Sequence, residues 1–485
     1  MRGAKLASAL VSSNRAEVLR SVVLAGVLGT AFGVPTARAG DTCQPHWRAL
    51  EAPGGVGVNN RVTTMSVYDD GTGPALYAGG EFWFAGCCDG GGLTVNRIAR
   101  WNGSGWSTLS GPNGVGITSL GSVWSTAVFD DGSGPALYAG GTYSAAGGVT
   151  VNNIARWNGS AWSALSGPSG TGVNGWVFSL AEFDDGSGPA LYAAGGFTTA
   201  GGVTVNRIAK WDGSAWSALV HAGGVGHGSQ CNALAVFDDG SGPALYIGNT
   251  NGLVRWDGSS MSTPAGPNGL GVGGWVLALE VFDDGSGPAL YASGNFANAG
   301  GMTVNNIARW DGSVWSALSG PGGVGIDGPL VTALGSFDDG SGPALYAGGA
   351  FSTAGGVTVN NIARWDGSVW SALASPGSVG VSDQIHALTV FDDGTRDGPA
   401  LFAGGYHWQI GDTTVFNISK WQGCAVTPPP CLADINGDGT LDFFDVQLFL
   451  SLYAAGNLAT DFTGDGTLDF FDVQAFLNLY AAGCP

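Results

Sequence analysis

Residues 175–219 read GWVFSLAEFDDGSGPALYAAGGFTTAGGVTVNRIAKWDGSAWSAL, and this unit decides the fold. It contains four apolar runs separated by turn sequences that are rich in Asp, Gly, Ser and Thr. The runs are residues 175–183, 190–197, 206–211 and 216–219. Short apolar runs bounded by such turns predict four short antiparallel β-strands, because Gly and Asp adopt tight-turn conformations at little cost.

The unit is written seven times along the chain. Its Phe/Tyr-Asp-Asp-Gly element begins at Tyr68, Phe129, Phe183, Phe237, Phe282, Phe337 and Phe391. The prolines of the Gly-Pro-Ala-Leu-like element that follows are Pro74, Pro135, Pro189, Pro243, Pro288, Pro343 and Pro399. The tryptophans of the Ile-Ala-Arg-Trp-like element are Trp101, Trp157, Trp211, Trp256, Trp310, Trp365 and Trp421. The spacing runs from 45 residues (Phe237 to Phe282) to 61 residues (Tyr68 to Phe129). Four strands repeated at this period predict an all-β, seven-bladed β-propeller over residues 40–424.

The seventh repeat lacks a fourth strand, and the N-terminal region supplies the missing sequence. The fourth strand begins at Trp106, Trp162, Trp216, Trp315 and Trp370, with Met261 as the degenerate copy. No such element follows Trp421, but Trp47-Arg48-Ala49-Leu50 precedes the first repeat. We therefore predict that an N-terminal strand completes the last blade, closes the ring and removes its exposed edge.

Charge and the N-terminal segment indicate an exported protein. The formal net charge of −20 argues against a nucleic acid partner, which would require clustered Lys and Arg. Residues 1–39 have the pattern of a signal peptide: basic residues precede an apolar run at Val22–Val34 and an Ala37-Arg38-Ala39 cleavage site. No other segment is apolar over the length of a membrane span. We expect a secreted, extracellular protein, with attachment to the cell surface as one option.

Residues 431–485 contain a calcium loop followed by a helix, twice. The expected ligands of the first loop are Asp434, Asn436, Asp438, Thr440, Asp442 and Asp445. Those of the second loop are Asp461, Thr463, Asp465, Thr467, Asp469 and Asp472. Oxygen ligands at positions 1, 3, 5, 9 and 12, a backbone carbonyl at position 7 and a glycine at position 6 suit calcium. The segment has eight Asp and no Lys, Arg, Glu or His, so cations would also relieve its self-repulsion. We predict two bound calcium ions.

The doubled loops resemble the type I dockerin, and the phrases Cys431-Leu-Ala-Asp and Ala-Gly-Cys-Pro resemble its GC-type variant. The resemblance covers about 55 residues and implies calcium-dependent docking onto a cohesin-like or other anchoring protein. The expected partner-reading positions are Phe443, Phe444, Phe470 and Phe471. The apolar stripe of each helix, Val446, Phe449, Leu450 and Tyr453 or Val473, Phe476, Leu477 and Tyr480, is expected to form the helix–helix core. Residues 425–430 are a stiff, Pro-rich linker. The propeller repeats resemble kelch-like and fungal cortical-marker repeats, which imply no particular activity.

The seven cysteines suggest two disulfides in an exported chain. Cys43 and Cys424 fall at the two sides of the predicted closure, and Cys431 and Cys484 bracket the calcium module. We predict the pairs Cys43–Cys424 and Cys431–Cys484, with free thiols as the alternative. Cys87, Cys88 and Cys231 stay unassigned. A metal site at His221, His227 and Cys231 is disfavoured, because the spacing fits no zinc pattern.

Positions that vary between repeats are the candidates for function, since features common to all seven are architectural. The Asp-Asp-Gly pairs are predicted to be turn structures rather than weak calcium sites. The basic residue of the third strand is predicted to be a structural stem packed along aromatic rings. The variable residues near the start of each first strand, where a central channel would open, are Arg61, Trp124, Trp176, Gln230, Trp275, Gln384 and His386. Aromatic rings and amides of this kind suit stacking and hydrogen bonding to sugars, and packing between blades is the alternative.

Two functions follow from these features. The first is a dockerin-anchored binding or scaffold protein, with a polysaccharide as the candidate ligand. The alternative is a polysaccharide lyase or hydrolase delivered by its dockerin, for which no catalytic triad or paired glycosidase carboxylates are visible in the sequence. A cluster of acid, base and arginine at the channel mouth would favour the enzyme, whereas seven-fold uniformity there would oppose it. A purely structural surface component is a third option.

Overall fold

The structure is a computed structural model that describes residues 45–485, except for 53, 88–91, 112–113, 168–169, 376, 396–397, 425–432, 434, 436–440, 442, 455–456, 458–459, 461, 463–466, 469 and 483–485. The chain divides into two compact units. One is Gln44–Cys424, and the other combines Met1–Cys43 with Ala425–Pro485. Within the described residues, no helix is long and apolar enough to cross a membrane.

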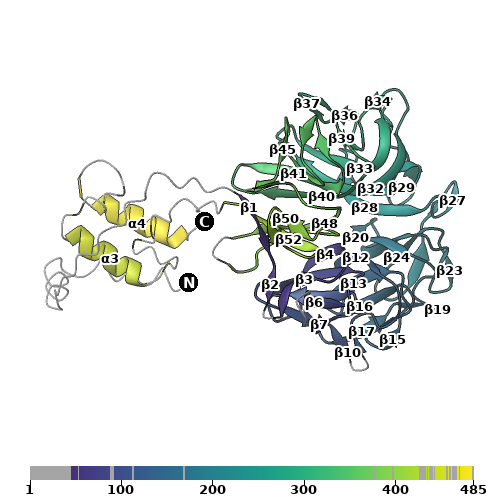
Figure 1. The fold of residues 1–485 in the computed structure, drawn as a ribbon, viewed down its shortest axis with the longest axis horizontal. Helices are drawn as coiled ribbons and strands as arrows, with labels where there is room; N and C mark the ends of the chain where they lie inside the picture. Colours follow the sequence, from purple (N-terminus) through teal and green to yellow (C-terminus); the bar gives the residue numbers. More distant parts are fainter. Residues whose placement is uncertain are drawn as a thin grey trace. The chain divides into compact units, whose positions relative to one another are not determined.

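The first unit is a β-propeller-like all-β fold of small antiparallel sheets (Figure 1). In the described residues each repeat contributes one four-stranded sheet, and the fifth repeat adds a further strand to its sheet. The first strands are β4 (Val62–Asp69), β12 (Val123–Asp130), β20 (Val177–Asp184), β28 (Cys231–Asp238), β32 (Val272–Asp283), β40 (Leu330–Asp338) and β48 (Ile385–Phe391). The second strands are β5 (Pro74–Gly80), β13 (Pro135–Gly141), β21 (Pro189–Gly195), β29 (Pro243–Asn249), β33 (Pro288–Ala299), β41 (Pro343–Ala350) and β49 (Ala400–Gly405).

The outer half of each sheet carries the paired tryptophans. The third strands are β8 (Ile98–Trp101), β16 (Ile154–Trp157), β24 (Ile208–Trp211), β30 (Gly252–Trp256), β35 (Ile307–Trp310), β44 (Ile362–Trp365) and β52 (Ile418–Gln422). The fourth strands are β9 (Trp106–Thr108), β17 (Trp162–Ala164), β25 (Trp216–Ala218), β31 (Met261–Ser262), β36 (Trp315–Ala317), β45 (Trp370–Ala372) and β1 (His46–Ala49). The four runs expected between residues 175 and 219 are thus found as β20, β21, β24 and β25.

The connections between the main strands, which were predicted to be turns, contain short hairpins. Those between the second and third strands use β6 (Phe84–Cys87), β7 (Leu93–Thr94), β14 (Ala145–Ala146), β15 (Val149–Thr150), β22 (Thr199–Ala200), β23 (Val203–Thr204), β34 (Met302–Thr303), β42 (Thr353–Ala354), β43 (Val357–Thr358), β50 (Gln409–Ile410) and β51 (Thr413–Thr414). Those between repeats use β2 (Glu51–Ala52), β3 (Gly55–Val58), β10 (Ser110–Gly111), β11 (Gly114–Val115), β18 (Ser166–Gly167), β19 (Gly170–Thr171), β26 (Val220–His221), β27 (Gly224–Val225), β37 (Ser319–Gly320), β38 (Gly323–Val324), β39 (Ile326–Asp327), β46 (Ala374–Ser375) and β47 (Ser378–Val379). The predicted turn at 198–202 is one of these hairpins, since β22 pairs with β23.

The first strands pack against one another in a closed cycle. Each contacts the first strand of the next repeat, and β48 of the seventh repeat contacts β4 of the first. A buried apolar residue in each first strand packs against a glycine or another small residue in the second strand of the preceding repeat. A Cβ added to Gly79 would lie 2.7 Å from Val123 Cγ1, and one added to Gly404 would lie 2.5 Å from Val62 Cγ1. Second strands therefore need small residues at this position, which helps to explain the 87 glycines of the chain.

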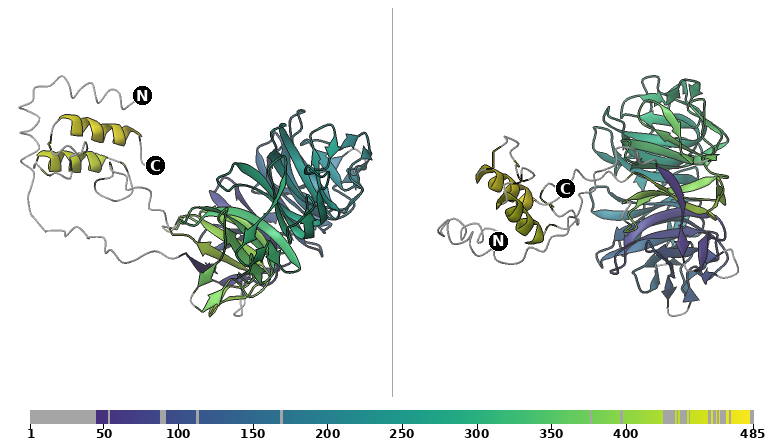
Figure 2. Two further views of the ribbon diagram at one scale, coloured as in Figure 1. Left: turned by 90° about the horizontal axis from the view of Figure 1, so that it is seen from above. Right: turned by 60° about the vertical axis from the view of Figure 1, so that its left-hand side comes forward.

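The N-terminal strand closes the last sheet, as expected from the sequence. β1 pairs antiparallel with β52, with Trp47 opposite Trp421 and Ala49 opposite Ser419. Figure 2 shows this purple strand beside the green strands of the seventh repeat. The two indole rings lie 5.3 Å apart, and Trp47 is 8 % exposed.

The Asp-Asp-Gly turns are structural, as predicted, and the basic residue of the third strand is part of the same network. In the first repeat, Asp69 Oδ1 accepts hydrogen bonds from the N–H groups of Gly71 (2.8 Å) and Gly73 (3.0 Å). Asp70 Oδ2 accepts the hydroxyl of Tyr77 (2.9 Å) and lies 3.2 Å from Arg100 Nε. The same ion pair joins Asp131 and Arg156, Asp185 and Lys210, Asp239 and Arg255, Asp284 and Arg309, Asp339 and Arg364, and Asp393 and Lys420. These cations were expected to be structural stems along aromatic rings, as Lys210 is along Tyr192, and each one also pairs with an aspartate.

The second unit contains two helices in its described part, one after each loop. α3 (Phe443–Ala454) and α4 (Phe470–Ala482) pack through Phe449 and Phe476, whose rings stack 4.1 Å apart and 1° from parallel. Val446, Tyr453, Val473 and Tyr480 pack around this pair. Leu450 and Leu477 were expected in the core but are exposed, because the close ring stack already fills the space between the helices.

Replacing Trp47 by Ala should lower the free energy of unfolding of residues 44–424 by about 3 kcal/mol, because it removes a buried indole from the closing strand. Denaturant unfolding followed by near-UV circular dichroism would measure the loss. The control is Trp176→Ala, which removes an exposed indole and should change stability by less than about 0.5 kcal/mol. Equal effects of the two substitutions would contradict a closing role for β1.

Replacing Asp185 by Asn should destabilise the protein at neutral pH but not in acid. Burial acts to raise the pKa of Asp185, but hydrogen bonds from Lys210, Ser187 and Tyr192 and the charge of Lys210 lower it to about 2. The carboxylate therefore contributes stability above pH 4, and this contribution disappears as the pH falls through about 2. We expect D185N to lose about 2 kcal/mol at pH 7 and the difference to shrink below pH 4. Asp184→Asn is the control, since it keeps the oxygen that accepts two backbone N–H groups and does not pair with Lys210.

Candidate functional site

A cavity of about 610 Å³ lies where the seven first strands meet. Its lining comes from every repeat, from Thr63–Met65 of β4 through to His386–Leu388 of β48. The loop into each first strand was expected to open near a central channel, and this cavity lies there.

A β-bulge interrupts every first strand at the same place. In β4 the pairing with β5 skips from Val62 to Thr64, and in β48 the pairing with β49 skips from Ile385 to Ala387. The extra residue of each bulge is Thr63, Trp124, Phe178, Asn232, Leu277, Thr332 or His386. All seven bulged residues line the cavity. Since a bulge turns an extra side chain out of the sheet pattern, it presents these residues to the channel.

The bulged residues are of six types, whereas the residues just before them are all compact and apolar. The preceding positions are Val62, Val123, Val177, Cys231, Val276, Val331 and Ile385, all completely buried. The seven repeats therefore share one packing position and vary the next one. This ring of bulged residues breaks the symmetry of the fold where a ligand could enter.

The second and third repeats give the channel an aromatic side. The ring of Trp124 lies 6.0 Å from that of Phe178, and Phe178 lies 5.8 Å from Trp176. Trp176 stands two residues before the bulge and is 55 % exposed, so its ring extends the aromatic surface to the rim. Arg61 of the first repeat places its guanidinium 5.2 Å from the Trp124 ring centre, within the range of a cation–π interaction.

Arg61 also belongs to a charged cluster at the rim. Its Nη2 lies 2.5 Å from Glu81 Oε1, which also accepts the hydroxyl of Ser122 at 3.3 Å. Nearby, Arg97 lies over the Trp83 ring at 3.8 Å and donates to the carbonyl of Gly121. Burial lowers the pKa of Arg97, and the charge of Glu81 opposes this.

His386 is the titratable residue among the bulged positions. Burial lowers the pKa of His386 to about 4, and the positive charge of Arg61 acts in the same direction, against Glu81 and Asp383. The imidazole is therefore neutral at physiological pH, with one donor and one acceptor nitrogen.

The other polar bulged residues are held by the backbone of the next repeat. Thr63 donates to the carbonyl of Val123, and Thr332 donates to that of Ile385 at 2.7 Å. Asn232 donates to the carbonyl of Val276 at 3.3 Å and accepts from Gln230 at 3.0 Å. These hydrogen bonds tie neighbouring first strands together across the bulges.

The seven candidate residues from the sequence occupy three kinds of place. Trp124, Gln230 and His386 line the cavity. Arg61 and Trp176 contact residues that line it. Trp275, 53 % exposed, and Gln384, half-buried, precede their bulges and are not among the lining residues. The carbonyl of Gln384 accepts the N–H of Tyr406, which adds another aromatic ring, 52 % exposed, in the seventh repeat.

The sequence-based candidates did not include Phe178, Glu81, Tyr406 or most of the bulged residues. The signal was present: an alignment of the repeats on the buried residue before each bulge shows one position that is different in nearly every copy. These candidates also did not include Glu280, which lines the cavity where other repeats have Ser, Ala, Gly or Thr. Burial raises the pKa of Glu280, although a hydrogen bond from Ser336 at 3.0 Å opposes this.

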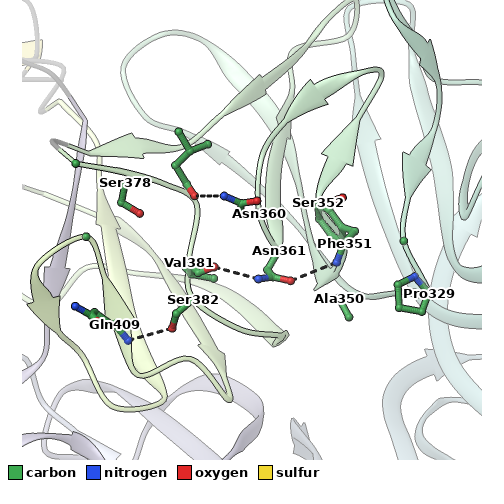
Figure 3. A pocket seen from close by; sticks show the side chains of 14 residues that line it. Pro329, Ala350, Phe351, Ser352, Asn360, Asn361, Ser378, Val381, Ser382 and Gln409 are labelled. Carbon is green, nitrogen blue, oxygen red and sulfur yellow. Dashed lines mark hydrogen bonds between the residues drawn. The ribbon is translucent and has the colours of Figure 1, made fainter.

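A second hollow, of about 670 Å³, lies between the sixth and seventh repeats, and its polar groups are used by the fold (Figure 3). Asn360 donates to the carbonyl of Val379 and Asn361 to that of Val381, both at 3.0 Å. Both asparagines have left-handed backbone conformations, with φ of 47° and 68°. Equivalent bonds join Asn152 to Thr171 and Asn153 to Val173, so this arrangement is a repeated link between neighbouring repeats.

Several other predicted sites are only partly within the described residues. Of the calcium ligands, Asp445, Thr467 and Asp472 are described, and the other nine lie outside the described residues, as do Cys43, Cys431 and Cys484. Cys424 is disulfide-bonded. Its predicted pairing with Cys43 stays a prediction. Phe443 is exposed on α3, while the side chains of Phe444, Phe470 and Phe471 lie outside the described set.

The histidine–cysteine group that the sequence disfavoured as a metal site is not assembled as one. Cys231 is a buried free thiol, and His221 bonds within its own hairpin, to Gly226 and Gly223. In the part of the chain that the structure describes, no group of three or more His, Cys, Asp or Glu side chains could hold a metal ion.

Comparison with known proteins finds distant likeness to solved structures. No family model matches the chain, and no curated protein is similar to it. Among solved structures, it is similar to the extracellular domain of the one component system BT4673 from B. thetaiotaomicron, with 11 % identity and a TM-score of 0.44, over 78 % of this chain and 40 % of that one. It is also similar to BBS1N in complex with ARL6DN, with 12 % identity and a TM-score of 0.40, over 79 % of this chain and 98 % of that one. The chain thus spans less than half the length of the first structure, and neither likeness bears on function.

Proposed function

We propose that this protein is a secreted, seven-bladed β-propeller that binds a polysaccharide at the mouth of its channel. A calcium-folded dockerin at residues 431–485 would attach it to a cell-surface or extracellular complex. Support for the propeller comes from the cyclic packing of the first strands and from the pairing of β1 with β52. The signal-peptide pattern of residues 1–39 supports export.

The observation that carries the binding proposal is the ring of seven bulged residues, of six types, around one cavity. Next to it, Trp176, Trp275 and Tyr406 expose more than half of their surface. Exposed aromatic rings beside hydrogen-bonding groups suit the apolar faces and hydroxyls of sugars. Packing between repeats does not need such exposure, since the core positions are buried without it.

The second candidate function is a polysaccharide lyase or hydrolase, and the cluster of Arg61, Glu81 and His386 favours it. An acid, a base and an arginine are combined there in a way that the other repeats do not share. The pKa of His386, about 4, makes its imidazole a weak general base at neutral pH. Glu81 is engaged by Arg61 and Ser122. Binding is therefore the better supported function.

The dockerin proposal is supported by two buried carboxylates. Asp445 and Asp472 stand at position 12 of their loops, in the first turns of α3 and α4, and both are 0 % exposed. Position 12 is a calcium ligand in loops of this kind, and the burial of both carboxylates at this position is compatible with calcium bound by the loop oxygens. The helices that follow the loops are related by the Phe449–Phe476 stack, in keeping with a duplicated module.

The binding proposal predicts that Trp176→Ala and Trp275→Ala each weaken polysaccharide binding about tenfold, because each removes a stacking surface worth on the order of 1.4 kcal/mol. The measurement is affinity electrophoresis or calorimetry of the full-length protein with a panel of neutral and acidic polysaccharides. Val369→Ala, which truncates an exposed apolar side chain on an outer hairpin turn, is the control and should leave affinity unchanged.

If the wild-type protein binds none of the polysaccharides, the proposal is wrong and a structural role becomes the better account. If a bound polysaccharide is also cleaved, and His386→Ala abolishes the cleavage, the enzyme replaces the binding protein as the conclusion.

Removing calcium should unfold residues 431–485 and leave residues 44–424 folded, because metal binding supplies the folding free energy of such loops. We expect chelation to abolish the helical circular dichroism signal of the C-terminal unit and to leave the melting of the β-sheet unit unchanged. Addition of calcium should restore the signal. Helical signal that survives chelation would refute the dockerin assignment.

A further inference from the structure

The bulged ring has two chemically different sides. In the cyclic order of the first strands, the second and third repeats lie across the channel from the fifth to seventh repeats. Trp124 and Phe178 therefore face Leu277, Thr332 and His386 across a cavity of about 610 Å³, a volume within the usual range for small-ligand sites. Thr332 already donates its hydroxyl proton to the backbone of the next repeat.

On that side, His386 is the polar residue whose ring nitrogens are available for hydrogen bonds to a ligand. Within the described residues its ring makes no hydrogen bond, and the influences on it are burial and the charges of Arg61, Glu81 and Asp383. The neighbouring His407 is turned to Ser419, with Nε2 2.9 Å from the hydroxyl. A half-buried imidazole without a partner is costly unless a ligand or water satisfies it. Because it is neutral, it can both donate and accept.

The charges of the channel disfavour an anionic ligand. The residues that line the cavity include Glu280 but no Arg or Lys. At the rim, Arg61 is paired with Glu81, and Arg97 is engaged by Trp83 and by the carbonyl of Gly121. Arg207 donates to the carbonyl of Gly196, beside Trp176. Inside the cavity, a uronate or sulfated sugar would meet a carboxyl group and no cation among the lining residues, at a cost in desolvation.

We infer that the channel receives one uncharged sugar ring of the bound polysaccharide, packed against the aromatic side formed by Trp124 and Phe178 and hydrogen-bonded through its hydroxyls to His386. This inference rests on the proposed function of the rim, and it adds the class of the ligand and the residue that hydrogen-bonds to it. Stacking and a two-way hydrogen bond are complementary to a hexopyranose, which has an apolar face and an equatorial belt of hydroxyls.

The test uses the full-length protein, calorimetry and defined oligosaccharides. The probes are uncharged gluco-, manno- and xylo-hexaoses, with oligogalacturonate as the acidic comparison. We expect an uncharged hexaose to bind more tightly than oligogalacturonate. His386→Ala should weaken that binding about tenfold, the loss of one or two hydrogen bonds, whereas His386→Gln should retain most of it because an amide also donates and accepts.

Two controls separate binding from folding. His221→Ala changes a histidine whose ring bonds within its own outer hairpin, and it should bind as the wild type does. Thermal melting of each variant establishes that it is folded. As a direct readout, the ¹⁵N chemical shifts of the His386 ring in the wild-type protein should move on addition of the hexaose, while those of His221 should not.

Three results would overturn the inference. If His386→Ala binds as tightly as the wild type while Trp176→Ala does not, the sugar stays at the rim: the proposed function survives and the inner site is wrong. Preference for oligogalacturonate would refute the uncharged class. Absence of binding to every oligosaccharide and polysaccharide would remove the proposed function and this inference together.

Discussion

Packing of a β-branched or similarly compact side chain against a glycine of the neighbouring repeat is the contact on which this structure depends. Val123 against Gly79 and Val62 against Gly404 are two instances, and a single added methyl group would collide in either. The contact draws adjacent sheets together near the channel and fixes which face of each first strand is buried. With that residue held in the core, the chain has to bulge at the next one before it resumes pairing. The same steric constraint that assembles the ring therefore aims the following side chain into the channel.

The buried packing position and the variable bulged position are adjacent along the chain. The position before the bulge accepts only compact apolar residues, and the bulged position accepts Trp, Phe, Asn, Leu, Thr and His. The Asp-Asp-Gly turn at the far end of each first strand is equally uniform. Its first carboxylate accepts backbone N–H groups, and its second lies beside a tyrosine or its counterpart and pairs with a cation of the third strand. A fold that assigns stability to repeated positions can vary the seven bulged residues around its cavity without loss of the ring.

Much of the fold could be predicted from the sequence, because the same strand and turn sequences recur in each repeat. The four strands per repeat, the closing strand at Trp47 and the structural role of the Asp-Asp-Gly turns all follow from patterns that recur. A single strand does not reveal the bulge, since a one-residue slip in pairing leaves no mark on it, and the variable position emerges only when all seven repeats are compared. For this reason the sequence pointed to Trp176 and Gln230 but not to Phe178 and Asn232, two residues further along the chain. The ion pairs of Arg100 and its counterparts, and the rim pair of Arg61 with Glu81, also depend on contacts between distant segments that no local pattern contains.

The pairing of β1 with β52 also bears on how the protein folds. His46 lies opposite Gln422, so the last sheet joins residues at nearly the two ends of the β-sheet unit. A contact across so long a loop forms late and slowly, since the entropy of closing the loop must be lost before the strands gain anything from pairing. Six sheets can be assembled by local hairpins, but the ring stays an open arc with a free edge until the strand at residue 422 has emerged. The ring is therefore completed only when almost all of the unit is present, and until then β52 has a free edge.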